Sequence, residues 1–176
     1  MAKSTRTNWA RLSAAPQLPD GTDGVFTQID LSAYVDPLQS KAFKIVEAKM
    51  ILMSNDVPYG VLDSSTVASH YTSIGMQIAT GTQTTILRPA DGKVIYHNAA
   101  GFFHDADAGT NFVFQEVKVS DLWPDGYLAV VDTLTAGVDN DTTLGANFRI
   151  MFSVTGYQVS VTANQLASLL VAQTMQ

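Results

Sequence analysis

From Val25 onward the chain is a series of short segments in which apolar and polar residues alternate. Almost every segment ends at a Gly, Pro, Asn or Asp turn signal. Alternation with a period of two is typical of half-buried β-strands. No helical pattern between the segments is long enough for the crossover that parallel strands require. The pattern therefore predicts an all-β domain of antiparallel strands, arranged as a sandwich or a barrel.

We expect eight or nine strands in this domain. The predicted strands are 25–31, 43–53, 74–80, 83–87, 93–96, 111–119, 127–134 and a segment that begins at Asn147. A connection of twenty residues, Ser54 to Ser73, separates the second strand from the third. Because it is longer than most connections in compact domains, we expect a contact loop there.

The segment "NFRIMFSVTGYQVSVTANQLASLL", which starts at Asn147, changes its hydrophobic register at Gly156. A hairpin with Thr155 and Gly156 at its tip would place Val154 and Tyr157 on one face, and this is the interpretation that we favour. A glycine bulge in one bent strand gives the same parity and remains the alternative.

A short helix is predicted after this segment, over about 163–173. Thr162 and Gln165 have the spacing of a capping box, in which each side chain bonds to the other residue's backbone N–H. Leucines then recur at helical spacing and form a candidate contact face; they are Leu166, Leu169 and Leu170.

Residues 1–24 differ from the rest of the chain. Lys3, Arg6 and Arg11 precede the first acidic residue, and prolines and glycines interrupt any regular element. We expect an extended N-terminal arm, followed by a single domain over 25–176. The three cations and Trp9 are candidates for contact with a neighbouring subunit or a polyanion, and a frayed terminus is the alternative.

Composition narrows the functional classes. The 176 residues suffice for one packed core. Cysteine is absent, which excludes disulfides, thiolate metal sites and a cysteine nucleophile. Charged residues make up only 15% of the chain and the net charge is −6, which argues against a nucleic-acid platform. A weakly charged surface suits packing in an assembly, and an ordinary polar surface is the alternative.

No motif for catalysis or cofactor binding is present, so we expect neither an enzyme nor a bound cofactor. Asp105 and Asp107, and likewise Asp139 and Asp141, are spaced as in calcium loops. Neither pair continues into the glycine and the later glutamate of a full loop, so these are weak calcium candidates and we expect no metal. The histidines lack the spacing of a zinc site; they are His70, His97 and His104.

The N-terminal arm ending in "PDGTDGVFTQIDLSAYV" and the terminal "ANFRIMFSVTGYQVSV" resemble single jelly-roll capsid (coat) proteins of icosahedral viruses. In size and acidity the chain looks closest to the small coat proteins of tailless double-stranded DNA viruses of bacteria and archaea. The resemblance implies an antiparallel eight-stranded jelly-roll sandwich with an extended N-terminal arm and a short C-terminal helix.

The resemblance also implies a structural role in the virion. The chain would form homo-oligomers or assemble with a second capsid protein, and its arm would contact an underlying membrane or the genome. It would need no small-molecule substrate. The expected interface residues are Lys3, Arg6, Trp9, Arg11, Leu166, Leu169 and Leu170. The alternatives are a carbohydrate-binding β-sandwich module and a phage decoration or fibre-head protein.

Overall fold

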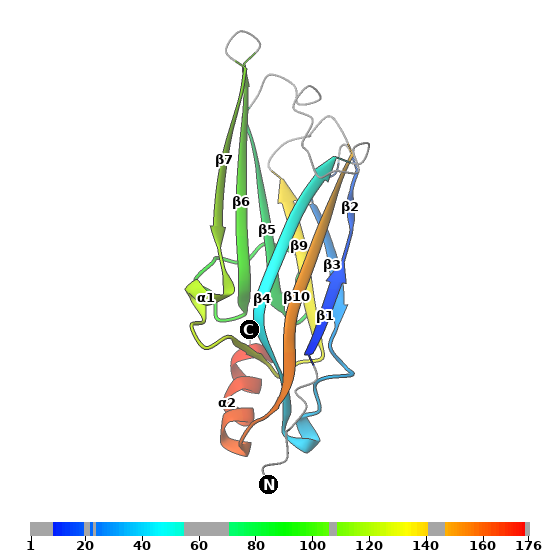
Figure 1. Cartoon of the computed structure of the whole chain (residues 1–176), viewed down its shortest axis with the longest axis vertical. Helices are drawn as coiled ribbons and strands as arrows, with labels where there is room; N and C mark the ends of the chain where they lie inside the picture. Colours follow the sequence, from blue (N-terminus) through cyan, green and yellow to red (C-terminus); the bar gives the residue numbers. More distant parts are fainter. Residues whose placement is uncertain are drawn as a thin grey trace.

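The computed structural model describes residues 9–19, 22, 24–54, 71–105, 109–140 and 147–174. These residues form an all-β sandwich with a C-terminal helix (Figure 1). The strands are β1 (Trp9–Ala14), β2 (Gln17–Leu18), β3 (Gly24–Asp30), β4 (Lys41–Ser54), β5 (Tyr71–Thr80), β6 (Val94–Asp105), β7 (Gly109–Val117), β8 (Tyr127–Ala129), β9 (Thr133–Asn140) and β10 (Phe148–Ser160). The helices are the 3-10 helix η1 (Pro37–Gln39), α1 (Val119–Leu122) and α2 (Ala163–Thr174).

The strands form two antiparallel sheets. Sheet A has the order β1-β10-β4-β8, and β2 continues along β10 beyond β1. Sheet B has the order β3-β9-β5-β6-β7. The predicted all-β antiparallel sandwich is thus confirmed, although the described residues hold ten strands where eight or nine were expected.

The strand pairs are nested along the chain. β1 pairs with the last strand, β10, and β3 pairs with the next to last, β9. Further in, β4 pairs with β8, and β5 pairs with β6. The pairs β4–β10 and β5–β9 then join the nested pairs into the two sheets.

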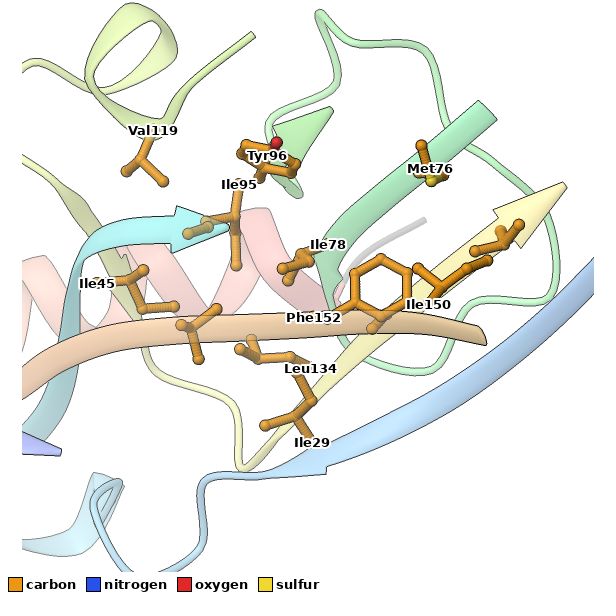
Figure 2. Packing of buried hydrophobic residues seen from close by; sticks show 14 of the residues in the cluster. Ile29, Ile45, Met76, Ile78, Ile95, Tyr96, Val119, Leu134, Ile150 and Phe152 are labelled. Carbon is orange, nitrogen blue, oxygen red and sulfur yellow. The ribbon is translucent and has the colours of Figure 1, made fainter. Parts of the chain in front are cut away.

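The core lies between the two sheets. Side chains from β4 and β10 point toward side chains from β5, β6 and β9 (Figure 2). Those that lose all or nearly all of their exposure include Phe43, Ile78, Tyr96, Leu134 and Phe152. Burial of this apolar surface is the main force that holds the sheets together.

Residues 9–18 belong to sheet A, whereas the sequence predicted an arm outside the fold. β1 pairs with β10 from Trp9 to Ala14, and β2 continues the same edge. The Pro16 carbonyl accepts a hydrogen bond from the Ile150 N–H at 3.1 Å, so the proline does not end the pairing. Leu18 is only 1% exposed. The sequence did not indicate β1 as a strand because its inward-facing residues are mostly alanines, which make the apolar and polar alternation weak.

β10 is one strand from Phe148 to Ser160, so the favoured hairpin at Gly156 is wrong. The register with β4 shifts between Thr155 and Gly156, so a bulge is present at this point of the pairing. Thr155 lies opposite Glu47 and Gly156 lies opposite Ile45, so the additional residue is Val46 of β4. The bulge therefore lies in β4, whereas the alternative placed it in the strand that contains Gly156.

Because β10 continues straight past β1, Val154 and Tyr157 lie on opposite faces of sheet A. Val154 is fully buried in the core. Tyr157 lies directly opposite Trp9 on the outer face. The shared face that the sequence predicted for Val154 and Tyr157 is therefore wrong.

Residues 83–87, a predicted strand, form part of a loop that folds over the outer face of sheet B. The Gln77 side chain accepts a hydrogen bond from the Leu87 N–H at 2.9 Å and donates one to the Leu87 carbonyl at 2.8 Å. Ile86 lies over Gly75 and Gly137, where a Cβ atom would come within 3.9 and 3.6 Å of it. The apolar pattern of 83–87 thus reflects packing on a sheet.

Three further boundaries differ from the prediction. β6 extends to Asp105 through residues expected to be a connector, and β9 likewise extends to Asn140. The predicted strand 127–134 is split into β8 and the start of β9. Interior glycine and polar residues account for the misses in β6 and β9, because such residues resemble turn signals in a sequence.

Candidate interaction surfaces

The outer face of sheet A carries an aromatic pair at the edge strand β1. Trp9 and Tyr157 face each other across β1 and β10, with ring centroids 4.8 Å apart and planes at 50°. Trp9 remains 59% exposed. Arg11 lies two residues further along the same face of β1 and is also exposed. The structure thus brings together two of the predicted contact residues, while Lys3 and Arg6 lie outside the described residues.

The predicted leucine face belongs to α2, whose predicted position is confirmed. Thr162 and Gln165 form the capping box: the Thr162 N–H donates to Gln165 Oε1 at 3.0 Å, and the Gln165 N–H donates to Thr162 Oγ1 at 3.3 Å. The leucines are half-buried against the sandwich; they are Leu166, Leu169 and Leu170. Their role as an interface remains a prediction.

Gln173 is a contact residue of α2 that the sequence did not indicate. Its side chain accepts a hydrogen bond from the Val130 N–H at 3.0 Å and donates one to the Leu128 carbonyl at 2.7 Å. It is 4% exposed and is the one buried residue of the helix. A helical spacing of three and four residues places Gln173 on the face of Leu166 and Leu170, and this was the available signal.

A groove of about 410 Å³ lies between β4 and the segment formed by β7 and α1. Two ion pairs line it: Glu47 with Lys49 at 2.9 Å, and Glu116 with Lys118 at 3.9 Å. Among the described residues, β8 pairs with β4 only as far as Ile45. The groove therefore runs beside a strand edge that no described strand covers.

A buried polar chain leads from this groove into the sandwich. The Tyr96 hydroxyl donates to Glu116 Oε1 at 2.6 Å, and Asn98 Nδ2 donates to the Tyr96 hydroxyl at 3.2 Å. Burial, helped by the Glu116 hydrogen bond, raises the pKa of Tyr96. Tyr96 is therefore neutral and acts as a hydrogen-bond donor at physiological pH.

The candidate metal residues do not come together in the part of the chain that the structure describes. Asp105 ends β6 and Asp139 lies in β9, whereas Asp107 and Asp141 lie outside the described residues. Within the described ranges, no group of three or more His, Cys, Asp or Glu side chains could hold a metal ion.

The histidines are likewise separate. His70 lies outside the described residues, and His104 belongs to β6. His97, also in β6, is half-buried, and this burial lowers its pKa below the usual value. Within the described residues, no helix is long and apolar enough to cross a membrane.

No protein-family model matches the chain, and no curated protein matches it. Among solved structures, it is similar to a tailspike protein, gp49 of the Acinetobacter baumannii bacteriophage Fri1, described as a capsular polysaccharide depolymerase. The identity is 13%, the TM-score is 0.16, and the match covers 77% of this chain and 20% of that chain. The chain therefore spans about a fifth of the tailspike, and a TM-score this low supports no functional argument.

Proposed function

We propose that the chain is a structural coat protein of an icosahedral virion, built as a single jelly roll. It would assemble with copies of itself or with a second coat protein. The observation that carries this proposal is the nested strand pairing. β1 pairs with β10, β3 with β9, β4 with β8 and β5 with β6. A jelly roll is a double sheet of eight strands made of two Greek keys, and it contains such nested pairs.

The two strands beyond eight fit this proposal as extensions. β2 continues β1 along the same neighbour, β10, after an interruption at Pro16. β7 extends sheet B past β6 as an additional edge strand. Without them, eight strands remain, four in each sheet.

Because one fold serves many functions, the surface must support the structural role. The sheet edges offer unpaired backbone N–H and C=O groups, which readily pair with a strand of another subunit. The uncovered edge of β4 beside the charged groove is such a place.

Trp9 packs on Tyr157, which is near the end of β10, and α2 with its leucines begins shortly afterwards at Ala163. This end of the sandwich is therefore the expected centre of subunit contact. Large apolar and aromatic side chains supply most of the binding energy in such contacts.

The experiment is size-exclusion chromatography with light scattering, followed by electron microscopy, on the purified protein over a range of concentrations. We expect oligomers or closed particles of uniform size. A strict monomer at all concentrations, alone and with candidate coat proteins of the same virus, would sink the proposal.

The arm can be tested separately, but the deletion must stop at residue 8. Removal of residues 1–24 would also remove β1 and β2 from sheet A, so lost assembly would report only a damaged fold. Deletion of residues 1–8 removes Lys3 and Arg6 and leaves both strands intact. Reduced assembly without a change in melting temperature is the expected result.

A carbohydrate-binding module is the second candidate, and the exposed Trp9 ring beside Tyr157 favours it. Sugar rings stack on exposed aromatic faces, and Arg11 on the same strand could donate hydrogen bonds. Glycan-array binding by a monomer, abolished by Trp9→Ala and kept by Ser13→Ala, would establish this function in place of assembly.

A further inference from the structure

The strand β8, at the edge of sheet A, is the start of an uncharged apolar run, "YLAVV", from Tyr127 to Val131. Its inner side pairs with β4, where Tyr127 lies opposite Ile45 and Ala129 lies opposite Phe43. The unpaired N–H and C=O groups of an edge strand can pair with another strand, and this edge has no charged side chain or proline to prevent it. The edge of β8 therefore needs a cover.

Gln173 of α2 supplies that cover. Its side-chain amide has one carbonyl and one NH₂ group, as a peptide unit has a carbonyl and an N–H. It accepts from the Val130 N–H at 3.0 Å and donates to the Leu128 carbonyl at 2.7 Å. Leu128 and Val130 are two residues apart, so these are the groups that a neighbouring strand would use. The glutamine thus takes the place of a pairing strand.

The seat of α2 on the sandwich is loosely packed. Gln173 is its one buried residue, while the leucines on the same face are only half-buried. Hollows of about 350 and 310 Å³ flank it, one lined by Gln173 and Thr174 and the other by Leu170 with Val130. A helix of twelve residues is marginal alone in water, so α2 depends on this shallow seat.

We propose that α2 covers the β8 edge reversibly, and that a second copy of the chain pairs with this edge when α2 is released. The second copy fits because the run 127–131 is apolar, uncharged and able to pair antiparallel with itself around a two-fold axis. In Figure 1, α2 lies at the lower end of the sandwich, near the lower ends of β4 and β10. This inference rests on the proposed self-assembly, which supplies the second copy, and it identifies β8 as a contact strand.

The test compares wild type with Gln173→Ala by sedimentation velocity, at concentrations where the wild type is monomeric. Loss of both hydrogen bonds should raise the population with a free edge roughly tenfold or more. We expect concentration-dependent dimers in the variant. Hydrogen exchange read by NMR should show the Val130 amide losing roughly tenfold of its protection, while core amides of β10 keep theirs.

Two further variants make the assignment specific. Asn164→Ala changes an exposed residue of the same helix and should leave the protein monomeric. Leu128→Lys in the Gln173→Ala background places a charge on the edge, as natural edge strands do, and should restore the monomer. A monomeric Gln173→Ala protein, or a dimer that persists with Lys at 128, would overturn the inference. If wild type still forms particles, either result leaves the proposed coat function standing.

Discussion

Gly156 should not tolerate even a methyl group. A Cβ atom there would lie 2.3 Å from the Lys44 carbonyl oxygen and 2.9 Å from Phe43 Cε1. The φ angle of Gly156 is not positive, so space is the constraint. The bulge in β4 presses its backbone toward β10 at this point, and a backbone atom cannot move aside as a side chain can.

The magnitude for Gly156→Ala follows from two opposing effects. Overpacking against a rigid neighbour costs about 3 kcal/mol. Alanine also restricts the unfolded chain, which offsets about 0.5–1 kcal/mol. We therefore expect a net loss of about 2–2.5 kcal/mol, which in a chain of this length lowers the melting temperature by about 4–10 °C.

Urea unfolding followed by circular dichroism, together with calorimetry, measures this loss. Gly92→Ala is the matched control, because no atom lies within 4 Å of its Cβ position. The control should stay within about 0.5 kcal/mol of wild type. If Gly156→Ala is as stable as the control, the close approach of β4 to β10 is not the reason for this glycine.

Three further predictions concern other parts of the fold. Gln77→Ala removes both hydrogen bonds to Leu87 and should cost about 1–3 kcal/mol in urea unfolding, with faster proteolysis of the loop over sheet B. Leu18→Ala should cost about 2–5 kcal/mol by the same assay, whereas a residue in a free arm would cost nothing measurable. Burial, with the charge of Asp91, raises the pKa of Tyr127 to about 12. Because the unfolded state then loses its proton first, stability should fall by about 1 kcal/mol between pH 9 and 11, and less so in Tyr127→Phe.

The elements that could be predicted from the sequence are those whose pattern is local. The strand near 25–31 shows strict alternation, and β3 lies within one residue of it. The helix after Thr162 was predicted from a capping box, and both of its hydrogen bonds form. In these segments the residues that determine the structure lie next to one another in the chain.

The misses depend on residues far apart in the chain. The pairing register of β10 with β4 shifts at Gly156 because of the additional residue Val46, about a hundred positions earlier. Ile86 packs on glycines of β5 and β9, so 83–87 resembles a strand in sequence without pairing as one. The small inward-facing residues of β1 make its apolar and polar alternation weak, and the neighbouring prolines therefore led to the prediction of an arm.

The candidate surfaces show that composition alone does not identify an interface. The low charge and the many hydroxyl and amide residues suggested a surface made for neighbours. Yet Gln77 and Gln173 are 3% and 4% exposed, and each satisfies one backbone N–H and one carbonyl within its own chain. Part of the amide content therefore stabilises the fold itself. The nested strand pairing, and edges such as β8 that a glutamine of a loosely seated helix covers, are therefore what support the proposed assembly.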